Sequence, residues 1–456
     1  MSLVLGIDLG TSYFKLGLFN RQGDLCGLGR VKVPKDESEP GRCELSTEQF
    51  WAILKDGLAQ ALAQAQAKPD DIVAMSYSSQ ANSFLLLDEH DHPLTPLVLW
   101  PDRREEDIDP KLTVFWQQPA FLEVTGVGAV NEENCMAKIV WFQNQQPEIW
   151  SRTARVMTIS DYFTFGLTGQ YVGDQGTASL LGFWDLPNAC WWDEGLQCLA
   201  LTTDQLSQPL KPGTFAGKVT SDGAKRLGLP GEIPFAVGSL DHHMAAIGSG
   251  LGQHSDLSES TGTVMACLYY QENYQPHKNC LMGPSHKGQG YFQLAFNTDG
   301  AATLDWYKNT YAADMTYDDL SGLAENVSSG AEGLQVKTKA QNYKALTGFE
   351  NRTDNHHHGH FVRAIMEQKA EILNGLVQQL CGTQTPTRII ATGGGAKSKL
   401  WLQIKSDMIG SEFVATSCEE PACLGAAIFA ALAKGWYDDT NTISKAWITL
   451  KKTKKY

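Results

Sequence analysis

The stretch that decides the fold reads Val4-Leu5-Gly6-Ile7-Asp8-Leu9-Gly10-Thr11-Ser12-Tyr13-Phe14-Lys15-Leu16-Gly17-Leu18-Phe19. Its apolar runs, residues 3–9 and 14–19, predict two strands joined by a tight hairpin. Gly10, Thr11 and Ser12 then lie at the tip, where backbone N–H groups and hydroxyls suit the oxygens of a phosphate. Asp8 ends the first strand, where it can hold a metal ion or its waters. The alternative is an ordinary hairpin with a solvated acid and a Ser/Thr turn.

Two later stretches strengthen the phosphate reading. The plan of strand, Thr-Gly-Thr turn and apolar strand recurs in Leu257-Ser258-Glu259-Ser260-Thr261-Gly262-Thr263-Val264-Met265-Ala266-Cys267-Leu268. This recurrence indicates an internal duplication. A further predicted strand ends in three glycines within Arg388-Ile389-Ile390-Ala391-Thr392-Gly393-Gly394-Gly395-Ala396. A helix is expected over residues 398–410, with Ser398 as its N-cap. Glycines before a helix start let a planar or anionic ligand lie against bare backbone.

Six segments follow one another in a characteristic order. They are Gly6-Ile7-Asp8-Leu9-Gly10-Thr11-Ser12, Trp100-Pro101-Asp102-Arg103-Arg104, Ser160-Asp161-Tyr162 with Leu167-Thr168-Gly169, Gly238-Ser239-Leu240-Asp241, Ser260-Thr261-Gly262-Thr263 and Gly393-Gly394-Gly395-Ala396. In their order and spacing, from about residue 3 to residue 437, the chain resembles the FGGY family of carbohydrate kinases within the actin-like ATPase superfamily.

The resemblance implies an α/β fold of two ribonuclease-H-like (actin-like ATPase) domains with a catalytic cleft between them. Residues 1–248 would form the sugar-binding domain with the first phosphate hairpin. Residues 249–456 would form the second domain, with the second phosphate hairpin and the adenosine site. ATP and a small sugar are the implied ligands, and a homodimer is left open.

The implied reaction moves the γ-phosphoryl group of ATP onto a sugar hydroxyl, with Mg²⁺ as the metal and Asp8 as its ligand. Such a transfer needs positioning, neutralisation of phosphate charge and an acceptor for the hydroxyl proton. The family's catalytic base falls on Asp241, after Gly238-Ser239-Leu240. The alternative for Asp241 is a helix N-cap at a strand-to-helix junction, which could coexist with catalysis.

The implied nucleotide contacts form three groups. Gly10, Thr11 and Ser12 would hold the β- and γ-phosphates, Thr261, Gly262 and Thr263 the other side, and Gly394, Gly395 and Ser398 the α-phosphate and adenosine. The sequence contains no Gly-x-x-x-x-Gly-Lys-Ser/Thr motif, which excludes a P-loop kinase. Lys15 is either a phosphate lysine or an exposed one.

The acceptor sugar is expected at a polar segment between two short predicted strands and at the segment that follows Trp100. The implied substrate contacts are Gln80, Ala81, Asn82, Asp102, Arg104, Asp241 and His242. Xylulokinases usually show Met-His, and glycerol kinases Arg-Glu, where this chain has Ala81-Asn82, so glycerol is disfavoured. Asn82 can bond hydroxyls without favouring a charge, which makes a neutral ketopentose or pentitol the first choice and an aldonate the second. For Asp102 and Arg104 the alternative is a surface turn with a local ion pair.

Composition narrows the classes of partner and compartment. With 51 acidic against 37 basic residues, the net charge of −14 disfavours nucleic acid and anionic membranes as partners. The ten cysteines include no Cys-x-x-Cys pair, and no apolar run reaches the roughly eighteen residues of a membrane span. We therefore expect a cytoplasmic protein with reduced thiols. The His-rich run at residues 356–360 is read as a loop before a helix rather than as a metal site.

A rival class shares the implied fold. In actin-like and chaperone ATPases the nucleotide drives a partner interaction and no small acceptor is phosphorylated, and a pseudokinase that only binds sugar is a third reading. Asp241 and the polar segment around Asn82 favour a kinase over both.

Overall fold

The computed structural model describes residues 1–104, 107–128, 130–382 and 384–451. The chain divides into two compact units. The first consists of Met1–Gly248, Gln271–Phe292 and Cys418–Ile448, and the second of Ser249–Tyr270, Gln293–Ser417 and Thr449–Tyr456. The chain passes from the first unit to the second at the boundary expected at residue 248. It later returns to the first unit twice, so this boundary is one of several.

The first unit is built on a mixed sheet with the strand order β13-β14-β5-β1-β2-β3, and β15 pairs with β5. Its strands are β1 (Leu3–Leu9), β2 (Tyr13–Phe19), β3 (Leu25–Lys32), β5 (Ile72–Ser79), β13 (Phe215–Lys218), β14 (Pro234–Ala236) and β15 (Ser239–Leu240). β1 runs antiparallel to β2 and parallel to β5. The predicted N-terminal hairpin is therefore confirmed.

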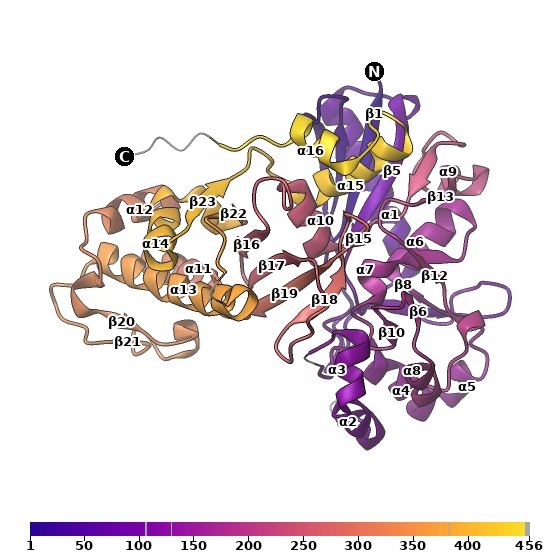
Figure 1. Cartoon of the computed structure of the whole chain (residues 1–456), viewed down its shortest axis with the longest axis horizontal. Coiled ribbons are helices and arrows are strands. Elements are labelled where there is room, and N and C mark those ends of the chain that lie inside the picture. The colour runs from indigo at the N-terminus through magenta and orange to yellow at the C-terminus, as the bar shows by residue number, and fades with distance from the viewer. Residues whose placement is uncertain (105–106, 129, 383, 452–456) are drawn as a thin grey trace. The chain divides into compact units, whose positions relative to one another are not determined.

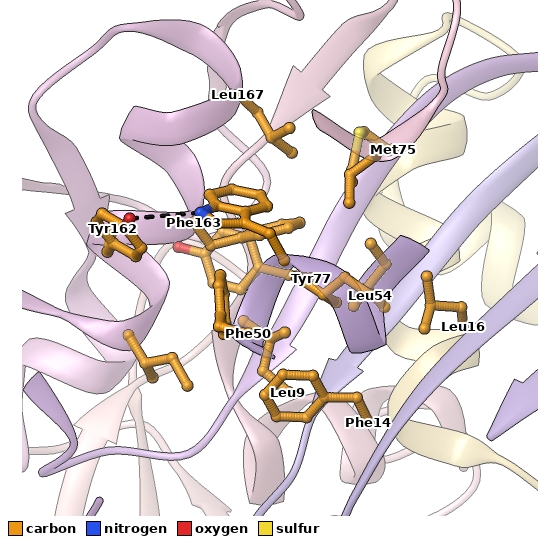
Figure 2. Packing of buried hydrophobic residues seen from close by; sticks show 14 of the residues in the cluster. Leu9, Phe14, Leu16, Phe50, Leu54, Met75, Tyr77, Tyr162, Phe163 and Leu167 are labelled. Atoms are coloured by element: carbon orange, nitrogen blue, oxygen red, sulfur yellow. Dashed lines mark hydrogen bonds between the residues drawn. The ribbon is translucent and has the colours of Figure 1, made fainter. Parts of the chain in front are cut away.

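An aromatic core holds helices against this sheet, as Figure 2 shows. Helix α1 (Thr47–Ala65) starts at Ser46, whose side chain accepts from the N–H of Gln49, and helix α6 (Ile159–Thr168) ends at Gly169. The rings of Phe50 and Phe163 lie 6.4 Å apart in a T-shaped arrangement, and Tyr77 of β5 lies 6.0 Å from Phe163. These contacts fix the hairpin and β5, whose ends carry the predicted site residues.

Helix α15 (Pro421–Ala433) explains why the late segment belongs to the first unit. A Cβ added to Gly6 of β1 would lie 2.1 Å from the carbonyl oxygen of Cys423, so the strand and the helix touch at bare backbone. Gly425 approaches Met244 of helix α10 (Asp241–Gly248) as closely. Figure 1 shows α15, in yellow, beside the indigo β1. Small residues at these positions let the C-terminal helix pack on the N-terminal strands.

The first unit contains further sheets and helices. A second sheet has the order β4-β7-β6-β8, made of β4 (Glu44–Leu45), β6 (Phe84–Leu87), β7 (Leu97–Val98) and β8 (Arg155–Thr158). The remaining strands are β9 (Val172–Asp174), β10 (Trp184–Asp185), β11 (Cys190–Trp191), β12 (Gln208–Leu210) and β18 (Leu281–Pro284). The remaining helices are α2 (Pro110–Trp116), α3 (Pro119–Thr125), α4 (Cys135–Gln145), α5 (Pro147–Trp150), α7 (Gln175–Ala178), α8 (Asp193–Cys198), α9 (Ser221–Leu227) and α16 (Thr440–Trp447).

The second unit repeats the plan of the first. Its strands follow the order β19-β17-β16-β22-β23 and are β16 (Leu257–Thr261), β17 (Met265–Gln271), β19 (Tyr291–Asn297), β22 (Arg388–Thr392) and β23 (Glu412–Ala415). β16 is antiparallel to β17 and parallel to β22, as β1 is to β2 and β5. The strand pairing therefore agrees with the internal duplication predicted from the sequence.

Among its described residues, the second unit also contains four α-helices and a short strand pair. They are α11 (Ala302–Tyr311), α12 (Tyr317–Glu325), α13 (His358–Cys381), α14 (Lys399–Ile409), β20 (Gln335–Val336) and β21 (Phe349–Glu350). Helix α14 begins after Ser398, whose Oγ accepts from the N–H of Trp401 at 3.2 Å, so the predicted N-cap is confirmed. Across the described ranges, no helix combines the length and the apolarity needed to cross a membrane.

Candidate active site

The register of the first sheet places three polar side chains in one row. Asp8 of β1 stands opposite Lys15 on the antiparallel β2 and opposite Ser78 on the parallel β5. Residues that face one another across adjacent strands share one side of a sheet. Ser78 Oγ donates to Asp8 Oδ1 at 3.0 Å, and Lys15 Nζ lies 3.6 Å from Asp8 Oδ2.

Asp8 sits in a strongly charged environment despite its burial. Burial raises the pKa of its carboxyl to about 6, with Lys15 acting against the rise and the charge of Asp241 adding to it. Lys15 Nζ also pairs with Glu420 Oε2 at 2.8 Å, at the start of α15. Lys15 is thus partly buried between two carboxylates, which rules out the reading as an unpaired exposed lysine.

Asp241 follows the end of β15, next to this row. Ser239 and Leu240 of β15 pair in parallel with Ser78 and Ser79 of β5, so Asp241 leaves the sheet at the carboxyl ends of its neighbours. Its side chain is half-buried, and its Oδ1 accepts from the N–H of His242 at 2.7 Å. Ligands of open α/β sheets bind at this edge. The structure therefore brings two of the predicted site residues, Asp8 and Asp241, close enough for the charge of one to act on the other.

The tip of the first hairpin is held by residues from the acceptor segments. Trp100 Nε1 donates to Thr11 Oγ1 at 2.6 Å, and Gln80 Nε2 donates to the carbonyls of Leu9 and Gly10, both at 3.2 Å. Gln80 Oε1 accepts from Ser83 Oγ at 2.8 Å. The buried Gln80 amide thus supports the hairpin, and its predicted contact with the substrate stays a prediction that this bonding argues against. Ser12 is exposed at the tip.

Asn82 lies in a strained turn after the buried Ala81. Its φ of 59° is in the left-handed region, which Asn tolerates better than most residues. Its Oδ1 accepts from the N–H of Cys135 at 3.1 Å, so its amide Nδ2 is the group that can donate to a hydroxyl. The fully buried Lys138 of α4 donates to the carbonyls of Asn82, Leu99 and Trp100 at 3.0, 3.2 and 3.2 Å. Burial lowers the pKa of Lys138 to about 8.

Asp102 and Arg104 form an ion pair, and this pair is buried. Arg104 donates to both carboxylate oxygens of Asp102 and to Glu44 Oε1 at 2.6 Å, and the N–H of Cys43 donates to Asp102 Oδ2 at 2.7 Å. The Arg104 guanidinium also lies 5.0 Å from the ring of Trp141. The local Asp–Arg pair that the sequence offered as an alternative is therefore present, in the interior and not at the surface. Direct contact of either residue with a sugar stays a prediction that this pairing argues against.

In the second unit, Thr261 faces the interior. Its side chain is fully buried, and its Oγ1 donates to Glu259 Oε2 at 2.7 Å and accepts from Lys405 Nζ at 2.8 Å. Alternation along β16 puts Thr261 on the same side as Glu259, and these bonds occupy its hydroxyl. The predicted contact of Thr261 with the nucleotide stays a prediction that this bonding argues against. The partly exposed Gly262 and the exposed Thr263 keep the predicted role.

The glycine turn after β22 packs against this Thr261. A Cβ on Gly395 would lie 2.8 Å from Thr261 Cβ, whereas Gly394 is exposed. Ser398 Oγ caps α14 and lies 3.0 Å from Ser321 Oγ, so its hydroxyl has partners other than a nucleotide. Gly394 is thus the member of this group best placed to meet a ligand.

The histidines singled out in the sequence are His242, the neighbouring His243 and the run at residues 356–360, and they differ in burial and in bonding. His242 is exposed, whereas His243 is buried against Ser239 and the ring of Phe292, and burial lowers its pKa to about 3. His357 accepts from the N–H of Gly359 and caps α13, which matches the loop before a helix expected there. Among the described residues, no group of three or more His, Cys, Asp or Glu side chains could hold a metal by itself.

Two family models match most of the chain. The N-terminal domain of the FGGY family of carbohydrate kinases matches residues 3–248, and its C-terminal domain matches residues 257–434. The chain belongs to the FGGY family of carbohydrate kinases. It is accordingly a phosphotransferase that uses ATP and an alcohol group as acceptor.

Curated FGGY kinases of two kinds resemble this one along nearly its full length. The xylulose kinase of Lactococcus lactis subsp. lactis is 27% identical over 461 residues, which span 99% of this chain and 92% of the relative. The gluconokinase of Bacillus subtilis is 27% identical over 463 residues, which span 97% of this chain and 90% of the relative.

Solved structures confirm the fold of this FGGY kinase. The ligand-bound xylulose kinase of Lactobacillus acidophilus superposes with a TM-score of 0.88 at 21% identity, covering 99% of this chain and 93% of that one. The glycerol kinase of Plasmodium falciparum with ADP gives a TM-score of 0.85 at 19% identity, covering 98% and 92%. The two-domain α/β sugar-kinase fold predicted from the sequence is confirmed.

Sequence reasoning missed several residues that shape the site of this FGGY kinase. They are Lys138, Glu420, Glu259 and Lys405. Lys138 left a signal, because a lone lysine inside the apolar run at residues 135–142 requires buried partners. Lys405 and Glu259 left a weaker signal. Each lies among apolar or small residues, but the two are far apart in the sequence.

Proposed function

We propose that this kinase phosphorylates a neutral ketopentose or pentitol, with Asp241 as the base that accepts the proton of the attacking hydroxyl. The proposal is supported chiefly by the position of Asp241, which follows β15 at the sheet edge where Asp8 lies next to the last residue of β1. A carboxylate that follows a strand at this edge can accept a proton while remaining fixed by the sheet behind it.

The first hairpin supplies the donors for the transferring phosphoryl group. Because Trp100 donates to Thr11 Oγ1, the Thr11 hydroxyl proton is directed away from Trp100 and can be offered to a phosphate oxygen. Lys15 adds a positive charge beside Asp8. Phosphoryl transfer depends mainly on such positioning and charge neutralisation, so these groups are the ones whose loss should slow the reaction.

The acidic residues of this edge fit a magnesium ion bound with ATP. Mg²⁺ prefers oxygen ligands and is commonly held by one or two carboxylates together with phosphates and water. Asp8 and Asp241 provide two carboxylates close enough for the charge of one to raise the pKa of the other. Asp8 would hold the ion directly or through water, and the ion would neutralise charge on the β- and γ-phosphates.

The charges around Asn82 favour a neutral acceptor over an aldonate. A carboxylate substrate needs a cation that is not already neutralised. Arg104 is committed to Asp102 and Glu44, and Arg103 pairs with Glu133. The ammonium of Lys138 lies against the Asn82 carbonyl, but it is fully buried and already donates to three backbone carbonyls. Asn82 offers an amide N–H, which suits a hydroxyl. The gluconokinase relative keeps gluconate as the second candidate, since it matches as well as the xylulose kinase does.

A panel of acceptors tests the proposal. The rate of ADP formation is measured with D-xylulose, other ketopentoses, pentitols, gluconate and glycerol, and the phosphorylated product is identified by phosphorus NMR. We expect a ketopentose or a pentitol to give a kcat/KM at least about tenfold above that of gluconate, a difference of about 1.4 kcal/mol in transition-state binding.

Other outcomes assign the alternatives. A preference for gluconate would show that a cation of this kinase meets the carboxylate of the substrate. ADP formation at one rate with and without every sugar would instead indicate an ATPase of the actin-like class. We also expect a cytoplasmic location, because the cysteines within the described ranges form no disulfide with one another.

A further inference from the structure

A buried ion pair lies directly behind the second Thr-Gly-Thr turn. Lys405 of α14 and Glu259 of β16 have fully buried side chains, and Lys405 Nζ lies 2.7 Å from Glu259 Oε1. Lys405 Nζ also donates to Thr261 Oγ1 at 2.8 Å, and Thr261 Oγ1 donates to Glu259 Oε2 at 2.7 Å. The three side chains thus close a cycle of hydrogen bonds around one ammonium group.

This cycle touches both turns of the second unit that are expected to meet the nucleotide. Thr261 opens the turn that continues into Gly262 and Thr263. A Cβ on Gly395, in the glycine turn, would lie 2.8 Å from Thr261 Cβ and 3.4 Å from Lys405 Nζ. Thr392, which precedes the glycines, donates from Oγ1 to the carbonyl of Glu259 at 2.9 Å. Lys405 and Glu259 therefore join β16, the glycine turn and α14 at one point.

A buried ion pair such as Lys405 and Glu259 is not explained by fold stability alone. Taking two ions out of water carries a large desolvation penalty, and apolar residues of similar size often replace a buried pair without loss. A pair that is retained can instead fix one geometry, because its short bonds are lost by a small displacement. Here the geometry fixed is the spacing between the two turns.

We propose that Lys405 and Glu259 are positioning residues for ATP, which set the nucleotide affinity of this kinase by holding the Thr261 turn against the glycine turn. The inference rests on the proposed role of these turns in nucleotide binding. It predicts that the pair acts on the nucleotide side of the reaction and leaves the acceptor sugar unaffected, because Asn82 and Lys138 belong to the other compact unit.

The test compares Lys405→Met, Glu259→Gln and the double variant with the wild-type enzyme. The melting temperature, the Kd for a non-hydrolysable ATP analogue and the KM values for ATP and the best sugar are measured. Lys405→Met leaves Glu259 buried without its cation, so this variant should melt at a lower temperature. The double variant removes both charges and should regain most of the lost melting temperature.

The decisive quantity is the nucleotide affinity of the double variant, whose melting temperature should be close to that of the wild type. We expect its Kd for the ATP analogue and its KM for ATP to remain at least about tenfold above wild type, a loss of about 1.4 kcal/mol, with the KM for sugar unchanged within about twofold. Arg363→Met is the matched control, since it breaks an ion pair with Glu367 inside helix α13 of the same unit. This control should leave both KM values unchanged.

Three results would overturn the inference. A double variant with wild-type melting and wild-type nucleotide affinity would mean that the pair only stabilises the fold. Equal increases in both KM values would indicate a general folding defect. A wild-type enzyme that binds no ATP analogue would refute the proposed nucleotide role of the turns as well, which separates that failure from the first two.

Discussion

Replacing Lys138 by Met tests how the acceptor segments are held. Met keeps the length of the side chain but removes the donors that reach the carbonyls of Asn82, Leu99 and Trp100 at 3.0, 3.2 and 3.2 Å. Each hydrogen bond to a charged group contributes about 1.5–3 kcal/mol. Removal of the buried charge also removes its desolvation penalty, so the net loss in unfolding free energy should be about 2–4 kcal/mol.

Of the two substrates, Lys138→Met should weaken the binding of the sugar. It should also lower kcat, because the Trp100 segment that Lys138 anchors donates to the Thr11 hydroxyl. Without the ammonium, the strained turn at Asn82 and the segment at Trp100 lose their shared anchor, and we expect the KM for sugar to rise about tenfold or more. The KM for ATP should stay within about twofold. The assay is a coupled ADP measurement at varied sugar and varied ATP, beside urea denaturation of the same preparation.

Lys111→Met serves as the control for this experiment, since Lys111 is an exposed lysine of α2. It should change neither stability nor either KM. Loss of stability in Lys138→Met together with a wild-type KM for sugar would refute the anchoring role of Lys138. In that case the ammonium supports the core without setting the geometry of the acceptor segments.

Three further substitutions probe separate parts of the first unit. Asn82→Ala should raise the KM for sugar by the equivalent of about 1–3 kcal/mol and spare the KM for ATP, whereas equal losses for both substrates would indicate a folding defect. Trp100→Phe removes the donor to Thr11 Oγ1 and should lower kcat by about tenfold with unchanged melting, and an unchanged kcat would show that this bond does not orient the hydroxyl. Burial, opposed by hydrogen bonds from Thr158, raises the pKa of Asp161 from 3.8 to about 7, so the folded state binds a proton that the unfolded state releases between these values. The stability contributed by this proton is present below the unfolded pKa and is lost as the pH rises through about 7. The free energy of unfolding should therefore fall by about 2–3 kcal/mol between about pH 5 and pH 8. Urea denaturation of Asp161→Asn should show a smaller fall over the same range.

Local patterns were sufficient to predict the hairpins and their polar tips. The strand, turn and apolar strand around Gly10, and their recurrence around Gly262, predict two antiparallel pairs, and the structure contains both. The capping serine at position 398 was equally readable, because an N-cap depends on residues within one turn of the helix.

The missed features all depend on contacts between distant parts of the chain. Lys138 meets carbonyls 38 to 56 residues away, and Lys405 meets Glu259 across 146 residues, so no local pattern reveals either partner. Alternation along β16 puts Thr261 on the same face as Glu259, but the contact with the distant Lys405 is what makes this face the buried one. The return of residues 418–448 to the first unit depends likewise on the fit of small residues in α15 against Gly6.

The most direct test of the proposed mechanism is the turnover of Asp241→Asn with the best sugar, measured beside the melting temperature of the same variant. Asn keeps the size and polarity of the side chain but cannot accept the hydroxyl proton. We predict a kcat lower by about 10²–10⁴-fold with a wild-type melting temperature. Normal melting with more than about a third of the wild-type rate would contradict the account, because a side chain that only caps α10 loses little as Asn.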